Sequence, residues 1–199
     1  MSRVALGFKA RTGRAVLVAL SGNAREPRVI ERSQVALLPE GEWAPYHAAE
    51  KLEPEEAREH VQRRIATAQR LATSAVSDAA RRCADAGHEL CGCAVLVGAG
   101  MPDWTTDEIL AVHVRMHKAE GELFRRVLVN GAEACGIELT TLPVKTAIDA
   151  AAAMLGVTRT QLDMQLATLG KSAGPPWGAH QKEAAAAALV VLDHAGPRR

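Results

Sequence analysis

Aromatic residues make up only 3% of this sequence of 199 residues, with one Tyr, two Phe and three Trp. Because large rings normally supply much of the buried volume, the core has to be built mainly from Ala, Val, Leu and Ile. Few rings remain as stacking platforms for single-stranded nucleic acid. The chain is nevertheless 48% hydrophobic and 24% charged, which excludes wholesale disorder. Its length suits one domain, which we expect to span residues 1–199.

A strong overall charge is also lacking, since the formal net charge is +1 at pH 7. Such a chain has no global field that would demand a nucleic acid or a membrane as its partner. The charge is unevenly placed, however, because residues 1–32 hold seven Lys or Arg against two acids, a local +5. The sequence therefore predicts a modest basic region on an otherwise neutral protein.

Cysteines are few, and the four present do not form a zinc-ribbon pattern. Cys91 and Cys93 make one C-x-C, and no second pair stands at the required spacing. Residues two positions apart on a strand share one face. We therefore expect both thiols to lie on the same side of a strand, in the core, as small apolar groups.

Long hydrophobic runs are missing as well. Arg3, Lys9 and Arg11 interrupt any apolar segment of a secretion signal, and the Ala-rich run at 184–191 is too short to span a bilayer. With its reduced thiols, the chain is expected to be a cytoplasmic protein with no membrane partner.

Apolar runs near the N-terminus, separated by short turns, predict a three-stranded antiparallel meander. Helical periodicity then alternates with two further apolar runs, which indicates an α/β fold: a mixed five-stranded sheet with helices on both faces. Pro54 suits a first helical position, and Thr105 and Glu108 have the spacing of a capping box. The expected strands are 4–10, 15–20, 28–38, 91–97 and 137–142, and the expected helices are 54–86, 105–135, 146–155, 158–169 and 180–194.

This order of elements is that of the ribonuclease H-like fold, and several segments resemble the RuvC-type Holliday junction resolvases of that superfamily. Residues 5–9, Ala-Leu-Gly-Phe-Lys, look like that family's first strand, L-G-I-D. Residues 132–137 followed by 143–145 are similar to its helix, strand and P-x-x-V-K turn. Residues 159–164 resemble the following K-x-Q-V-x-x-M helix, and residues 175–192 resemble the closing D-x-x-D-A-L-A helix.

The resemblance implies a nuclease whose carboxylates hold two Mg²⁺ or Mn²⁺ ions about 4 Å apart. Where that family has the bridging Asp, this chain has Lys9, whose ammonium would occupy the place of a metal ion. The family's Glu at the end of the fourth strand falls on Gly98 or Ala99. His180 and Glu183 keep the D-x-x-D spacing of the last helix and are the remaining candidate metal ligands. An ordinary helix start, with Glu183 near the positive end of the dipole, is the alternative interpretation.

Acidic residues beyond the motif offer a partial replacement. Asp103 follows the fourth strand, so a displaced catalytic site would use Glu183, His180 and Asp103. The neighbouring Asp107 and Glu108 have a sufficient role in capping a helix. Because one loop carboxylate does not replace a bridging ligand, we expect no working two-metal site and no bound cofactor.

A histidine pair is a separate candidate. His113 and His117 lie four apart on a predicted helix, the spacing at which two imidazoles can share a metal ion. No third ligand is fixed nearby, although Glu120 lies one turn on. On an apolar stripe that includes Phe124, His117 faces the sheet, and we expect a hydrogen-bonded histidine at the edge of the core.

The best basic cluster is the predicted hairpin that contains Lys9, Arg11 and Arg14. These side chains could contact phosphates of a nucleic acid, where Lys and Arg give affinity without reading sequence. Arg159, at the start of a later helix, is a further candidate. A plain solvated hairpin tip is the alternative. The turn at 98–100 offers a second place for a phosphate.

Two tryptophans, Trp104 and Trp177, lie in loops near the presumed end of the sheet. If exposed, they indicate a ligand or partner surface; if buried, they are plugs.

Three functions follow from these observations. The first is a RuvC-like protein without most metal-binding carboxylates, which binds nucleic acid or a partner protein without cutting. The second is a Mg²⁺- or Mn²⁺-dependent structure-specific nuclease with displaced ligands. The third is a structural or scaffold homodimer, joined through helix faces rich in Ala.

Overall fold

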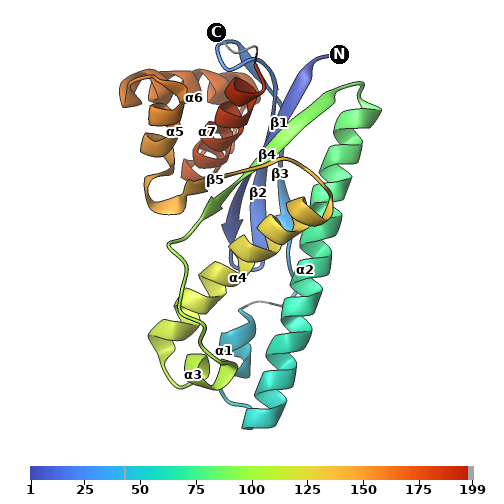
Figure 1. Cartoon of the computed structure of the whole chain (residues 1–199), viewed down its shortest axis with the longest axis vertical. Helices are drawn as coiled ribbons and strands as arrows, with labels where there is room; N and C mark the ends of the chain where they lie inside the picture. The colour runs from blue at the N-terminus through green and yellow to red at the C-terminus, as the bar shows by residue number, and fades with distance from the viewer. Residues whose placement is uncertain (43, 197–199) are drawn as a thin grey trace.

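The computed structural model describes residues 1–42 and 44–196, and its centre is a five-stranded sheet in the order β3-β2-β1-β4-β5 (Figure 1). β1 pairs antiparallel with β2 and parallel with β4, β2 pairs antiparallel with β3, and β4 pairs parallel with β5. The predicted meander and the two later strands are thus confirmed. The strands are β1 (Arg3–Arg11), β2 (Arg14–Gly22), β3 (Pro27–Ala36), β4 (Glu89–Val97) and β5 (Leu139–Pro143).

Helices cover both faces of the sheet, as the α/β pattern predicts (Figure 1). α2 and α4 pack on one face, and α5, α6 and α7 pack on the other. The helices are α1 (Pro45–Ala49), α2 (Pro54–Asp85), α3 (Thr106–Leu110), α4 (His113–Ala134), α5 (Ala147–Leu155), α6 (Arg159–Ala173) and α7 (Ala179–His194), with a 3₁₀ turn η1 (Val144–Thr146) between β5 and α5.

The continuous apolar run of β2 reflects this double cover. Leu17 and Ala19 are buried in the core beneath α2 and α4. Val16, Val18 and Leu20 are buried in the second core, beneath α5, α6 and α7. A strand that is buried on both faces needs apolar residues at every position rather than at alternate ones.

The Ala-rich run belongs to α7, which lies directly on the sheet. An added Cβ on Gly7 of β1 would stand 1.9 Å from the carbonyl oxygen of Ala184, so helix and strand touch backbone to backbone. Residues 184–192 are all buried. The small side chains that suggested a homodimer interface therefore pack within this chain.

Within the described residues, no helix is long and apolar enough to cross a membrane.

The C-x-C prediction is wrong in one respect, because Cys91 and Cys93 face opposite sides of β4. Cys93 is buried in the core beneath α2 and α4, whereas Cys91 packs against the other core. The pairing with β1 shifts between Val4 and Ala5, since Val4 lies opposite Leu90 and Ala5 lies opposite Gly92. This β-bulge inserts one extra residue, Cys91, which reverses the alternation of side chains.

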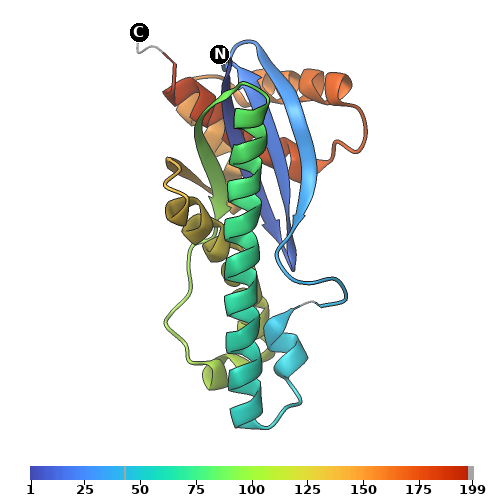
Figure 2. The same ribbon diagram turned by 90° about the vertical axis from the view of Figure 1, so that its right-hand side faces the viewer.

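Part of the molecule extends beyond the sheet. The first turns of α2 and α4 project past the strand ends and are joined there by two short helices, α1 and α3 (Figures 1 and 2). Neither short helix was expected. The expected strand 28–38 and helix 54–86 left no element between them, and the sequence predicts one helix over 105–135. In the structure the extended backbone of Val112, at φ −140° and ψ 112°, separates α3 from α4.

Candidate functional site

The carboxyl ends of β1, β4 and β5 meet at one edge of the sheet, where parallel strands present their ligand-binding groups. Lys9 lies near the end of β1, and its side chain is 11% exposed. Its Nζ is 2.8 Å from Oε2 of Glu183 on α7, whose side chain is 23% exposed. The sequence singled out Lys9, at the bridging position of the motif, and Glu183, in the last helix, for separate reasons. In the structure these two residues form one ion pair.

His180 joins this pair at longer range, with its Nδ1 3.9 Å from Oε2 of Glu183. Asp103 is exposed in the segment between β4 and α3. Within residues 1–42 and 44–196, His180, Glu183 and Asp103 do not bring their ligand atoms within 4.8 Å of one another. In this structure the three candidate ligands are therefore not gathered around one point.

Strands β1, β4 and β5 bring no carboxylate of their own to this edge of the sheet, where a pair of Mg²⁺ or Mn²⁺ ions would need one. Such ions need several oxygen ligands and bridging carboxylates. Glu183 faces an ammonium at 2.8 Å, and β4 ends at Val97 and is followed by Gly98, neither of which has a ligand atom in its side chain. The Lys9 ammonium places a positive charge directly beside Glu183.

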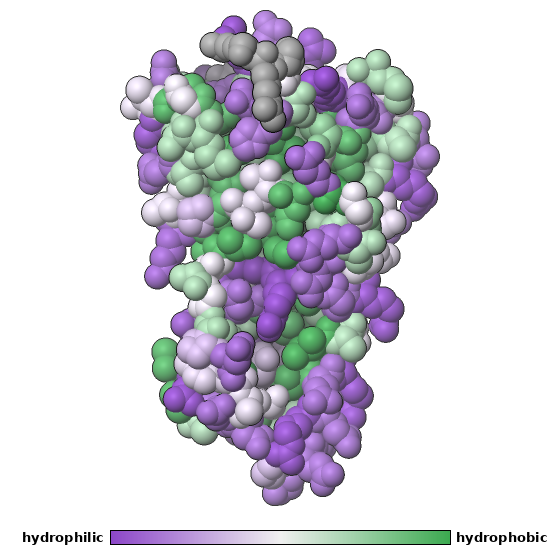
Figure 3. Space-filling view, in the orientation of Figure 1, coloured by the Kyte–Doolittle hydropathy of each residue, from purple (hydrophilic) through white to green (hydrophobic). Residues whose placement is uncertain are grey.

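A cleft of about 480 Å³ opens beside this edge, where β4 and β5 end against α4. Three cations line it, Lys118, Arg125 and Lys145, together with one carboxylate, Glu122. Three positive charges less one negative charge leave the lining at +2 with histidine neutral. Hydrophilic side chains gather over the middle of α4 on the face that Figure 3 shows.

The turn after β4 forms one wall of the cleft. An added Cβ on Gly98 would stand 2.8 Å from Nη1 of Arg125 and 2.9 Å from Oε2 of Glu122. Arg125 and Glu122 are themselves an ion pair at 3.6 Å. The missing side chain at Gly98 therefore lets a cation lie directly against the backbone of the turn, and the turn at 98–100 is part of a basic cleft.

The two tryptophans have different roles. Trp177 donates a hydrogen bond from Nε1 to the Leu166 carbonyl oxygen at 2.9 Å and packs against the core under α6, so it is a plug. Trp104 is half-buried near the cleft, and two cations lie over its ring: Arg115 at 4.9 Å and Lys118 at 5.5 Å from the ring centroid. Trp104 thus holds basic side chains at the surface.

The hairpin cations Arg11 and Arg14 lie opposite each other at the tip of β1 and β2, and both are exposed. Arg159 is placed differently: it pairs with Asp149 at 2.7 Å and with Asp163 at 2.9 Å. Its hydrogen bonds to these two carboxylates raise the pKa of the Arg159 guanidinium. The charge of Arg159 is thus matched locally, whereas the hairpin cations face solvent.

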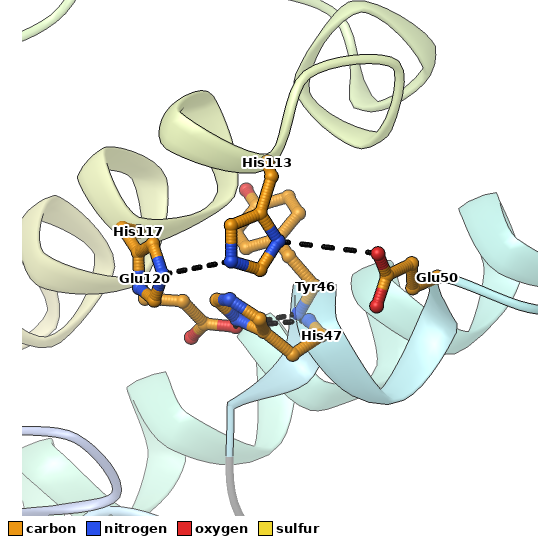
Figure 4. A network of polar contacts seen from close by, with 6 residues as sticks. All are labelled: Tyr46, His47, Glu50, His113, His117 and Glu120. Atoms are coloured by element: carbon orange, nitrogen blue, oxygen red, sulfur yellow. Dashed lines mark hydrogen bonds and ion pairs between the residues drawn. The ribbon is translucent and has the colours of Figure 1, made fainter.

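A second group of polar side chains lies in the extension beyond the sheet. His113 and His117 are exposed, and their Nε2 atoms are 3.1 Å apart (Figure 4). The expectation that His117 faces the sheet is wrong, because the buried stripe of α4 contains Met116, Ala119 and Glu120 instead. His47, on α1, completes the group, and one ring nitrogen from each histidine lies within 4.8 Å of the others.

Glu120 is buried beneath these histidines, with its side chain 5% exposed. Its Oε1 accepts hydrogen bonds from the backbone N–H groups of Tyr46, at 2.7 Å, and His47, at 3.3 Å. Nδ1 of His47 lies 3.4 Å from the same oxygen. Burial raises the pKa of Glu120 to about 7, and the two backbone hydrogen bonds oppose that rise. Glu120 fixes α1, and with it His47, against α4.

Comparisons with known proteins bear on the fold. No protein-family model matches the chain, and no curated protein matches its sequence. Among solved structures, the chain is similar to Thermus thermophilus RuvC in complex with a Holliday junction substrate, at 14% identity and a TM-score of 0.50, over 94% of this chain and 91% of that chain. A second T. thermophilus RuvC structure aligns at 13% identity and a TM-score of 0.48, over 94% and 92% of the two chains.

Identities this low show the fold and nothing finer. The strand order β3-β2-β1-β4-β5 with helices on both faces is the architecture that the resemblance implied, and the alignment with RuvC covers 94% of the chain. The chain therefore has a RuvC-like ribonuclease H fold.

Proposed function

We propose that this protein binds branched or duplex nucleic acid at the edge of the sheet where β1, β4 and β5 end, without cleaving it. The observation that carries the proposal is the ion pair between Lys9 and Glu183, 2.8 Å long, at the edge where the fold offers a place for catalytic metal ions. An ammonium there neutralises the carboxylate and leaves no pair of ligands for two divalent ions.

Cations at the same edge support binding. The cleft contributes Lys118, Arg125 and Lys145, and the hairpin tip contributes Arg11 and Arg14. Exposed Lys and Arg side chains give nucleic acids affinity through the phosphates, with release of counterions. The net charge of +1 for the whole chain makes this a local patch rather than a general attraction.

The nature of the first ligand to test comes from the structural comparison. The T. thermophilus RuvC structure contains a Holliday junction substrate. A four-way DNA junction is therefore the first probe, with linear duplex and an RNA–DNA hybrid as controls. Binding is read by fluorescence anisotropy of the labelled probe over a range of salt concentrations.

The decisive variant is the double substitution Lys118→Ala with Lys145→Ala, since both side chains line the cleft and are exposed. Each lost phosphate contact makes the negative slope of log affinity against log salt concentration less steep by about 0.9 on duplex DNA. The matched control is Arg81→Ala, which removes an exposed cation of α2 that is paired with Asp78. Absence of binding, or affinity that salt and the double substitution leave unchanged, contradicts the proposal.

The nuclease alternative requires His180, Glu183 and Asp103 to act together, and the described residues do not bring their ligand atoms together. The homodimer alternative rested on Ala-rich helix faces, and the Ala-rich run of α7 is buried within the chain. Both alternatives therefore have less support than binding without cleavage.

A further inference from the structure

Three histidines lie close together in the extension beyond the sheet. His117 also lines the cleft of the proposed nucleic-acid surface, whereas His47 and His113 do not. They come from two distant parts of the chain: His47 from α1, and His113 and His117 from the first turns of α4. Figure 4 shows the three rings turned toward one another. We propose that His47, His113 and His117 form a binding site for one Zn²⁺ ion.

The spacing of the ring nitrogens suits such an ion. One nitrogen from each ring lies within 4.8 Å of the other two, and the Nε2 atoms of His113 and His117 are 3.1 Å apart. Two nitrogens that bind one tetrahedral Zn²⁺ at 2.0–2.1 Å stand about 3.3 Å apart. The pair on α4 is therefore already close to the separation that coordination needs.

Close contact among the rings gives a second reason. The ring centroids are separated by 4.6 Å for His47 and His117, 4.6 Å for His113 and His117, and 5.3 Å for His47 and His113. Rings this close can each turn one nitrogen toward a common point, and a neutral imidazole nitrogen carries the lone pair that a metal ion binds.

Two carboxylates stand behind the rings, where they can orient them. Oε1 of Glu120 lies 3.4 Å from Nδ1 of His47, and Oε1 of Glu50 lies 3.9 Å from Nδ1 of His113. A carboxylate within hydrogen-bond distance of one ring nitrogen, as Glu120 is of His47, holds the hydrogen there and directs the lone pair of the other nitrogen toward the metal. Glu120 also accepts hydrogen bonds from the backbone N–H groups of Tyr46 and His47 in α1, so His47 is held in position without a bound ion.

The chemistry of the donors selects the class of ion. Imidazole nitrogens suit Zn²⁺ and its neighbours, whereas Mg²⁺ and Ca²⁺ require oxygen ligands. Within the described residues, the group comprises three ligands and both His113 and His117 are exposed, so solvent completes a tetrahedral ion. An ion at this position would lie beside the basic cleft, because His117 belongs to both.

The experiment titrates Zn²⁺ into chelator-treated protein that carries no polyhistidine tag, with heat as the readout. We expect one Zn²⁺ per chain and no heat from Mg²⁺. Loss of a residue that only orients a metal ligand weakens metal binding roughly 10–100-fold. We expect His113→Ala and His117→Ala, which each remove a ligand, to weaken Zn²⁺ binding by more than that. The control His194→Ala removes an exposed histidine of the last turn of α7 and leaves the affinity unchanged.

Two further readouts guard against a variant that simply fails to fold. Co²⁺ bound to the wild type should give the intense visible absorption of a four-coordinate ion, and Zn²⁺ should raise the Tm because it joins α1 to α4. A weak octahedral Co²⁺ spectrum, the absence of saturable Zn²⁺ binding, or unchanged affinity in folded His113→Ala and His117→Ala overturns the site. Failure of nucleic-acid binding would leave these results unaffected.

Discussion

Nζ of Lys9 and Oε2 of Glu183 are 2.8 Å apart, although 174 positions separate the two residues in the sequence. The close approach of α7 to β1 at Gly7 brings them together, because it places the first turns of α7 over the carboxyl end of the strand. A carboxylate that would be a metal ligand in a two-metal nuclease here has a lysine as its partner. The packing of α7 on the sheet thus places an ammonium beside the carboxylate on which the proposal of binding without cleavage rests.

The first prediction concerns the stability of this ion pair. Glu183→Ala removes the partner of a cation that is only 11% exposed, whereas Lys9→Met leaves a carboxylate that is 23% exposed and can turn toward water. We expect Glu183→Ala to lower the free energy of unfolding by about 1–3 kcal/mol, and Lys9→Met to lower it by less. Urea unfolding measures both.

The double variant Lys9→Met with Glu183→Ala supplies the control for that comparison. It should recover part of the loss seen in Glu183→Ala, since no unpaired charge remains. Losses that add without recovery would show that the two side chains do not interact in solution.

A second prediction tests the contact between α7 and the sheet. Gly7→Ala places a methyl group 1.9 Å from the Ala184 carbonyl oxygen, which is backbone and cannot turn aside. We expect a loss of more than about 3 kcal/mol in unfolding free energy, or failure to fold. Gly178→Ala is the matched control, because its nearest neighbour is the Gln181 side chain at 3.5 Å. Equal stability of the two variants would be inconsistent with the packing described.

The third prediction separates the two kinds of surface cation. Arg159 is held by Asp149 and Asp163, whereas Arg11 and Arg14 are exposed at the hairpin tip. Arg159→Ala should leave affinity for the four-way junction unchanged. The double variant Arg11→Ala with Arg14→Ala should reduce that affinity and make the slope of log affinity against log salt concentration less steep by up to about 1.8. Anisotropy titrations at several salt concentrations measure both variants. A loss of affinity in Arg159→Ala alone would reverse this assignment.

The fourth prediction concerns the thiols. Burial raises the pKa of Cys93 to about 12, and the charge of Cys135 adds to that rise. At pH 8 the native Cys93 should therefore react with iodoacetamide more than about a hundredfold more slowly than an unfolded thiol. Mass spectrometry of peptides from native and urea-treated protein follows the reaction. Equal rates in the two states would show that Cys93 is accessible.

Much of the fold could be predicted because its signals are local and periodic. The start of α2 at Pro54 and the capping box of Thr105 and Glu108 both appear as expected. The bulge at Cys91 could not be anticipated, because it depends on pairing with β1. The five-residue helices α1 and α3 are too short to show a period, and they form only where α2 and α4 hold them.

The candidate sites were predictable only in part. Lys9, His180 and Glu183 were identified from their positions in a motif, and the structure brings them together at one edge of the sheet. His47 gave no such signal, because it stands alone between Tyr46 and Ala48, 66 residues before His113. The cleft cations Lys118 and Lys145 were also missed, since they become neighbours only when α4 lies beside the end of β5.

The most direct test of the account is one reaction of labelled four-way junction with excess protein in Mg²⁺ or Mn²⁺, divided between a native and a denaturing gel. Binding without cleavage predicts a shifted band on the native gel and intact strands on the denaturing gel. Glu183→Gln runs beside the wild type, because it removes the carboxylate charge and keeps the size of the side chain. Strands that the wild type cuts and Glu183→Gln leaves whole would contradict the account, since they would show a working metal site built on Glu183.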